Sequence, residues 1–176
     1  MSLYLILNIA SFLVPFLYSF EKRMRYIKRW KAVFSAIVIV AIFFIVWDII
    51  FTKMGIWSFN PRYHSGIEFF DLPIEEWLFF ICIPYASLFI HFAFHYFYPN
   101  VSLTDKTVKT IYWIKIFVLL PTIFIHYDKL YTVINYSVLL LLLTYTVFKV
   151  PHILNTFFIT FLIILIPFTL MNGILT

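Results

Sequence analysis

The sequence predicts an all-α fold, a polytopic transmembrane helical bundle of about six helices. Of the 176 residues, 64% are hydrophobic and only 12% are charged, whereas a soluble domain is about half apolar and about a quarter charged. Six apolar stretches fill almost the whole chain. Each is about long enough to cross the ~30 Å core of a bilayer as a helix. We therefore expect an integral, multi-pass cell-membrane protein that is surrounded by lipid.

The apolar stretches define the predicted helices. They cover Leu3–Phe20, Ala32–Phe51, Ile74–Phe97, Ile111–His126, Thr132–Phe148 and Ile153–Asn172. The first is not expected to be a cleaved signal peptide, because no basic residue precedes it and no small-residue cleavage site follows it. Four prolines fall inside predicted helices, namely Pro15, Pro84, Pro121 and Pro167. In membranes such prolines usually mark kinks that open space between helices.

The basic residues predict the orientation of the chain. A cluster follows the first apolar stretch and consists of Lys22, Arg23, Arg25, Lys28, Arg29 and Lys31. By the positive-inside rule this cluster is cytoplasmic, so the N-terminus is expected outside the cytoplasm. Alternation of the helices then leaves only Lys53, Arg62 and Lys129 outside. The net charge of +5 is thereby explained by topology, and no nucleic-acid partner is expected.

The connection from Thr52 to Pro73 is much longer than the ~2–8 residues usual between neighbouring helices. It is rich in aromatic and polar residues. Such a loop at the outer surface is either an interfacial belt or a lid over a site. We favour a lid or a half-buried re-entrant segment.

An acidic pair, Glu75-Glu76, stands in the first turn of the helix predicted from Ile74, with Pro73 placed in the same turn. Asp48 lies near the outer end of the preceding helix, so the three carboxyl groups are expected at similar depth in one cluster. Acids at a helix start also complement the helix dipole by ~0.3–1 kcal/mol each, which leaves a purely structural role open.

The spacing of the pair argues for a chemical role. Consecutive helical residues point ~100° apart, so Glu75 and Glu76 cannot both face the headgroups comfortably. We expect one of the two carboxyl groups to face the headgroups and the other to point into the bundle, where it is poorly hydrated. A carboxylic acid that keeps its proton there can give it to a weak base, which is what acid catalysis needs. Aromatic residues make up 23% of the chain and could shelter a cation.

Other kinds of site are poorly supported. His91 and His95 share one helix face, but no third ligand is visible, so no metal site is predicted. The three glycines, Gly55, Gly66 and Gly173, lie too far apart to form a phosphate or dinucleotide loop. No tightly bound cofactor is therefore expected, and only a loosely bound redox cofactor stays open.

The end of the chain echoes its first half. Met54-Gly55-Ile56-Trp57 resembles Asn172-Gly173-Ile174-Leu175, and both follow helices predicted to run from inside to outside. We therefore expect a parallel internal repeat in which helices 5–6 repeat helices 1–2. Residues 1–98 would be the first repeat with three helices, residues 99–131 a linker with helix 4, and residues 132–176 an incomplete second repeat with two helices.

The motifs of the first repeat resemble a known family. Trp47-Asp48, Gly55-Ile56-Trp57-Ser58-Phe59-Asn60 and Leu72-Pro73-Ile74-Glu75-Glu76-Trp77 look like the lycopene cyclase domain of small carotenoid cyclases. These membrane enzymes are heterodimeric or fused. The resemblance covers about residues 1–98, and its most specific part is Pro-x-Glu-Glu. The family's second acidic motif is not found after Asn172–Thr176.

The resemblance implies a lycopene beta-cyclase of carotenoid biosynthesis. Such an isomerase closes the ends of lycopene into β-rings by acid catalysis without net electron transfer, and forms β-carotene. Its substrate would be a C40 hydrocarbon dissolved in the bilayer. Glu75 and Glu76 would be catalytic, and Asp48, Asn60 and Trp57 would be auxiliary. A homo- or heterodimer partner could supply the missing second motif.

Two alternatives stay open at this point. The chain could be a non-catalytic or partner-requiring membrane subunit in which the acidic pair merely caps a helix. It could also be a proton-coupled transporter, since intramembrane carboxyl groups and repeats occur in that class too. Which glutamate would donate the proton is not decided by the sequence.

Overall fold

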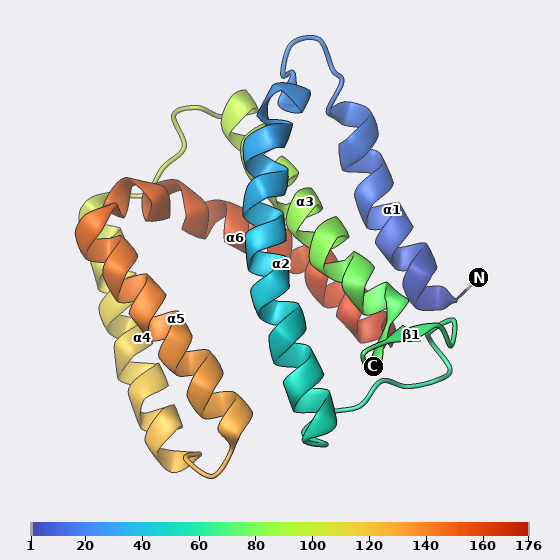
Figure 1. Ribbon diagram of the computed structural model, residues 1–176. Helices are drawn as coiled ribbons and strands as arrows, with labels where there is room; N and C mark the ends of the chain where they lie inside the picture. Colours follow the sequence, from blue (N-terminus) through green and yellow to red (C-terminus); the bar gives the residue numbers. More distant parts are fainter. Residues whose placement is uncertain (1, 176) are drawn as a thin grey trace. The chain divides into compact units, whose positions relative to one another are not determined.

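The computed structural model describes residues 2–175, without the side chains of residues 171, 172, 174 and 175. Most side chains of the predicted repeat motif at Asn172–Thr176 thus lie outside the described structure. The structure is mainly helical (Figure 1). The helices are α1 (Leu3–Tyr18), α2 (Trp30–Lys53), α3 (Ile74–Phe97), α4 (Asp105–Ile125), α5 (Leu130–Lys149) and α6 (Pro151–Leu175), with a short 3-10 helix η1 (Tyr26–Arg29) before α2. The prediction of an all-α fold is confirmed.

The helix bounds follow the sequence closely except at α4. Helix α3 begins and ends where predicted. Helix α4 begins earlier than predicted, at Asp105, because Thr104 caps it: Thr104 Oγ1 accepts the N–H of Thr107 at 3.2 Å. The first turns of α4 are polar, so the apolar pattern alone placed its start too late.

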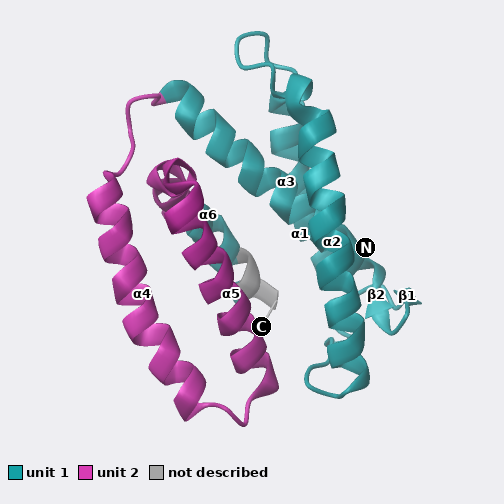
Figure 2. Cartoon of the chain, turned by 60° about the vertical axis from the view of Figure 1, so that its left-hand side comes forward, with its two compact units in different colours: residues 1–97, 164–176 teal, residues 98–163 magenta. Residues whose placement is uncertain are grey.

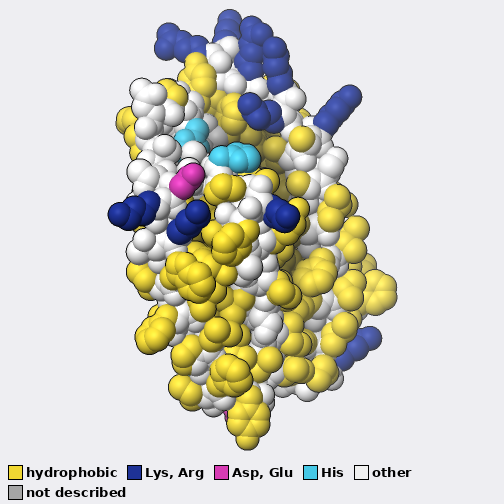
Figure 3. All heavy atoms as spheres, turned by 90° about the vertical axis from the view of Figure 1, so that its left-hand side faces the viewer, with side chains coloured by type: hydrophobic (Ala, Val, Ile, Leu, Met, Phe, Trp, Pro, Cys, Tyr) yellow, Lys and Arg dark blue, Asp and Glu magenta, His cyan; other side chains and the backbone are white. Residues whose placement is uncertain are grey.

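Among the residues that the structure describes, five helices are long and apolar enough to cross a membrane, and α1 is a shorter apolar helix of 16 residues. At ~1.5 Å per residue α1 is about 24 Å long, less than the ~30 Å hydrocarbon core. On the face drawn in Figure 3, hydrophobic side chains are abundant and few acidic side chains are visible. These features are compatible with a multi-pass membrane protein.

The chain divides into two compact units (Figure 2). Unit 1 comprises residues 1–97 and 164–176, and unit 2 comprises residues 98–163. In unit 1, α3 is the central helix and packs against both α1 and α2. In unit 2, α4 packs against α5 around Val108, Tyr112, Leu143 and Val147. The acidic pair and Asp48 all belong to unit 1.

One end of unit 1 is fixed by a buried hydroxyl network. Ser19 Oγ donates to the backbone oxygen of Pro15 at 2.6 Å. That uses the only hydrogen of the Ser19 hydroxyl, so the Tyr85 hydroxyl is the donor across the 2.6 Å contact with Ser19 Oγ. The oxygen of Tyr85 in turn accepts the indole N–H of Trp30 at 3.0 Å. The end of α1 and the start of α2 are thereby both joined to α3.

The long loop before α3 contains a small hairpin that the sequence did not predict. Strand β1 (Glu68–Phe69) pairs antiparallel with β2 (Leu72–Pro73). The two residues between them, Phe70 and Asp71, have φ angles of 55° and 64°. Two successive left-handed residues are typical of a type I′ turn, which usually carries Asn-Gly or Asp-Gly. The sequence placed Pro73 in the first turn of the helix. In the structure it lies instead in strand β2, just before α3.

Candidate functional site

The carboxyl group of Glu75 is enclosed by the start of α1 and by the long loop. Glu75 is fully buried, with 0% of its surface exposed. Its Oε1 accepts the hydroxyl of Ser2 at 2.5 Å and the backbone N–H of Ser65 at 2.8 Å. Its Oε2 has no hydrogen-bond partner among the described residues. One oxygen is therefore held by two donors, and the other is buried without a hydrogen-bond partner in the described structure.

Asn8 joins α1 to the backbone of the acidic pair. Its Nδ2 donates to the backbone oxygen of Glu75 at 2.8 Å, and the residue is 0% exposed. The Oδ1 of Asn8 has no partner within the described part of the chain. Asn8 also lines an apolar groove of about 300 Å³ between α1 and α3. The remaining lining residues are Ile9, Phe12, Leu13, Leu78, Ile81 and Cys82.

Glu76 is engaged by side chains from two other helices. Its Oε2 accepts the hydroxyl of Tyr4, from α1, at 2.6 Å. Asp48, from α2, is only 7% exposed and interacts electrostatically with both Glu76 and Tyr4. Glu76 itself is partly buried. The phenol of α1 thus contacts the Glu76 carboxyl group of α3, and the Asp48 carboxyl group of α2 lies near enough for its charge to act on both.

Aromatic rings lie one turn along α3 from Glu76. Phe79 and Phe80 follow Glu76 by three and four positions, which places them on the same side of the helix. The Phe79 ring contacts Tyr4 edge-on, with 6.3 Å between centroids, and contacts Phe80 at 5.6 Å. Phe80 stacks on Phe44 of α2 at 6.1 Å and an interplanar angle of 10°. The carboxyl groups therefore adjoin a continuous aromatic cluster built from all three helices.

The long loop covers the start of α1 and the Glu75 side chain. The backbone oxygen of Tyr63 accepts the N–H of Tyr4 at 3.2 Å. Ser65 from the same loop donates to Glu75, and the N–H of Ile74 donates to the backbone oxygen of Ile67 at 2.9 Å. Of the two predicted forms, these contacts favour a covering segment over a belt that only lies in the interface.

The structure places the other two predicted auxiliary residues in that loop. The indole N–H of Trp57 donates to Thr52 Oγ1 at 3.2 Å, and its ring lies 5.1 Å from that of Phe51. Asn60 is exposed, and its Oδ1 accepts the backbone N–H of Arg62 at 3.0 Å. These contacts shape the loop itself. A part for Asn60 or Trp57 in chemistry stays a prediction.

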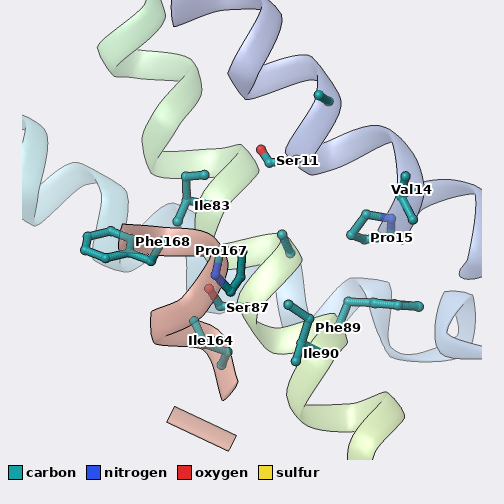
Figure 4. Close-up of a pocket in the computed structure, with 12 residues that line it drawn as sticks. Ser11, Val14, Pro15, Ile83, Ser87, Phe89, Ile90, Ile164, Pro167 and Phe168 are labelled. Atoms are coloured by element: carbon teal, nitrogen blue, oxygen red, sulfur yellow. The ribbon is translucent and has the colours of Figure 1, made fainter. Parts of the chain in front are cut away.

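Unit 1 also holds an apolar cavity of about 300 Å³ between α1, α3 and the last part of α6 (Figure 4). Two of the predicted helix prolines, Pro15 and Pro167, line it. The other lining residues are Ala10, Ser11, Val14, Ile83, Ala86, Ser87, Phe89, Ile90, Ile164 and Phe168. Its walls are almost wholly apolar, so it suits a hydrocarbon group and not a charged one.

His91 and His95 lie further along α3, with 4.7 Å between their ring centroids. Among the residues that the structure describes, no group of three or more His, Cys, Asp or Glu side chains could hold a metal ion.

Sequence reasoning identified Asp48, Glu75 and Glu76 but missed their partners on α1. Ser2, Tyr4 and Asn8 reach the acidic pair only because α1 packs against α3. Asn8 could have been found from the sequence, because burying an amide inside an apolar stretch costs free energy unless the amide has a hydrogen-bond partner. Nothing in the sequence distinguishes Tyr4 from the other tyrosines, of which the chain has 12 in total.

The chain matches the lycopene cyclase family over residues 1–94 and 128–176. The match includes every residue of the carboxylate site described above. It leaves out the segment from the end of α3 to the end of α4. No curated protein and no solved structure matches the chain. With most of its length matched, including the acidic pair and its partners on α1 and α2, the chain belongs to the lycopene cyclase family.

Proposed function

We propose that the chain catalyses the acid-initiated closure of the ends of lycopene into β-rings, as an isomerase of carotenoid biosynthesis. Family membership supports a role in carotenoid cyclisation. The observation that carries the proposal is the partly buried Glu76 carboxyl group, which accepts the Tyr4 hydroxyl beside an aromatic cluster; Asp48 lies nearby. An alkene is a very weak base, so its protonation needs a carboxylic acid and a place where the resulting cation is sheltered from water.

In this proposal Glu76 is the proton donor. The nearby Asp48 makes two negative charges unfavourable, so the pair holds a proton between them. That proton passes to the terminal double bond of the substrate and leaves a tertiary carbocation. The next double bond attacks this cation and closes the six-membered ring. The positive charge moves onto the ring, where the faces of Phe80 and Phe44 are suited to stabilise it.

Glu75 is the base. A carboxylate can only accept hydrogen bonds, and Glu75 Oε1 accepts two of them, from Ser2 and Ser65. Its Oε2 is left without a partner in the described structure, so it can take up the ring proton that must leave to form the new double bond. One proton is added and one is removed. The reaction is therefore an isomerisation, and it needs neither an oxidant nor a reductant.

The decisive experiment compares three glutamine variants in a bacterium that accumulates lycopene. Products are separated by chromatography and normalised to the amount of protein in the membrane. Glu76→Gln and Glu75→Gln are expected to abolish cyclic products, because each removes a proton donor or acceptor. Glu68→Gln is the matched control, since the Glu68 side chain is 50% exposed in the hairpin, and it should retain activity. Full activity of both site variants would reject the proposal.

The same assay tests whether a partner is required. All glutamates of residues 1–176 occur at or before Glu76, so a second acidic pair of this kind would have to come from outside these residues. We propose that a homo- or heterodimer partner completes the enzyme if the chain alone forms no cyclic product. Activity that depends on co-expression of a lycopene cyclase subunit, and on Glu76, would support that form of the proposal.

We further propose that the site faces the outer membrane surface, as the basic cluster from Lys22 to Lys31 predicts. Single cysteines at Arg62 and Lys28, in a Cys82→Ala background, test this with a membrane-impermeant thiol reagent. Labelling at position 62 and protection at position 28 in intact cells are expected. Labelling at position 28 and protection at position 62 would show that the chain has the opposite orientation.

A further inference from the structure

We propose that Tyr4 is a positioning residue that holds Glu76 and stabilises the charge that forms on it when its proton leaves. This inference rests on the proposed function, because it assigns Glu76 as the proton donor. Tyr4 was not among the residues that the sequence indicated. The structure brings it to Glu76 through the packing of α1 against α3.

The hydrogen bond from Tyr4 distinguishes the two carboxyl oxygens of Glu76. The hydroxyl of Tyr4 donates to Oε2 at 2.6 Å, so Oε2 acts as the carbonyl oxygen of the protonated acid. The proton to be transferred is then on Oε1. A single phenol thus fixes both the rotamer of the side chain and the oxygen from which the proton departs.

Tyr4 is itself held rigidly. Its backbone N–H donates to Tyr63 in the covering loop at 3.2 Å, and its ring packs edge-on against Phe79 at 6.3 Å. It lies in the first turn of α1, which Ser2 caps. The phenol therefore needs no rearrangement when charge develops on Glu76, which is the condition for electrostatic stabilisation of a transition state.

The hydrogen bond from Tyr4 should strengthen during the reaction. A donor binds a carboxylate more strongly than a neutral carboxylic acid, so its stabilisation is larger once the proton is leaving than before. Loss of a hydrogen bond to a charged group corresponds to a rate reduction of about 10- to 100-fold. Since the effect arises in the transition state, it should appear in kcat and leave KM almost unchanged.

The test replaces Tyr4 by phenylalanine, which keeps the ring and removes only the hydroxyl. Tyr18→Phe is the matched control, because Tyr18 ends the same helix and is 60% exposed. We expect a 10- to 100-fold lower kcat for Tyr4→Phe, an unchanged KM, and no change for Tyr18→Phe. An equal loss in both variants, or none in Tyr4→Phe, would overturn the positioning role.

An infrared readout tests the contact without relying on turnover. The C=O band of protonated Glu76 is identified as the band that Glu76→Gln removes. Tyr4→Phe should shift this band to higher frequency, because the carbonyl oxygen loses its donor. Fluorotyrosine at position 4 keeps every packing contact but is a stronger donor, so it should shift the band to lower frequency. If neither Tyr4→Phe nor fluorotyrosine shifts the band, the inference is wrong. The fluorotyrosine measurement stands even if Tyr4→Phe is unstable.

The two proposals can fail separately. If the parent chain cyclises lycopene and Glu76→Gln does not, while Tyr4→Phe is fully active, only the inference about Tyr4 fails. If no carboxyl band depends on Glu76, the proton donor itself is wrongly assigned and both proposals fail.

Discussion

The hydroxyl of Ser2 donates to Glu75 Oε1 at 2.5 Å while its oxygen accepts the N–H of Leu5 at 3.2 Å. Ser2, which caps α1, is therefore also a hydrogen-bond donor to the buried Glu75 at the start of α3. Formation of the first turn of α1 and placement of the Glu75 carboxyl group are coupled through one hydroxyl group. Local helix structure and the candidate site thus depend on the same atom.

This coupling predicts the effect of Ser2→Ala. Loss of an N-cap hydroxyl typically costs about 1 kcal/mol, and Glu75 also loses one of its two donors. We expect a lower thermal unfolding midpoint in detergent micelles. Ser2→Thr keeps a hydroxyl group and should retain most of the stability. Equal destabilisation by both substitutions would show that the hydroxyl is not the important group.

The aromatic cluster predicts a second effect, on rate. Phe80→Leu keeps an apolar side chain but removes the ring that stacks on Phe44. If these faces stabilise a cation by about 1–2 kcal/mol, the cyclisation rate should fall about 5- to 30-fold. Phe117→Leu is the control, because that ring is 82% exposed on α4. Initial rates of product formation decide the matter, and similar rates for both variants would exclude a role for the ring.

The network around Tyr85 predicts a third effect, on stability. Tyr85→Phe removes the hydroxyl that joins Ser19 to Trp30 and leaves the Trp30 indole N–H without that acceptor. The expected cost is about 1 kcal/mol. Tyr145→Phe, at a side chain that is 63% exposed, should have little effect on the unfolding midpoint. If the two variants unfold alike, the network does not contribute measurably.

The hairpin turn predicts that a glycine can stabilise the protein. Asp71 has a φ of 64°, a conformation that glycine adopts without steric cost. Asp71→Gly should raise the unfolding midpoint slightly, whereas Asp71→Ala should lower it, since alanine tolerates a left-handed backbone poorly. Both substitutions remove the carboxylate, so their difference isolates the backbone. A lower midpoint for the glycine variant would contradict the turn geometry.

The sequence predicted those features that depend on local pattern. The bounds of α3 were correct because Pro73 and the acidic pair mark its start and a mostly apolar run without charged residues defines its length. The start of α4 was missed because its first turns are polar. The hairpin was missed because Phe70-Asp71 lacks the glycine or asparagine that usually signals such a turn.

The candidate site was predictable only in part, because only some of its residues stand out in the local sequence pattern. Carboxyl groups in an apolar sequence are conspicuous, so Asp48, Glu75 and Glu76 could be named. Their donors come from another helix, and nothing in the sequence periodicity of α1 shows that Tyr4 faces Glu76. Asn60 was chosen by resemblance and lies in the exposed part of the loop. Contacts between helices are set by tertiary packing, which pattern reasoning does not reach.

Hydrogen bonds fasten α1 to α3 at both of its ends, through Ser2 at one and Ser19 at the other. Neither helix can slide or turn along its neighbour without breaking polar contacts that lipid cannot replace. The offset between the two helices, and with it the place of the acidic pair along them, is consequently fixed. A thinner or thicker membrane has to deform around this helix pair, so we expect the activity proposed above to depend on the acyl-chain length of the host lipid.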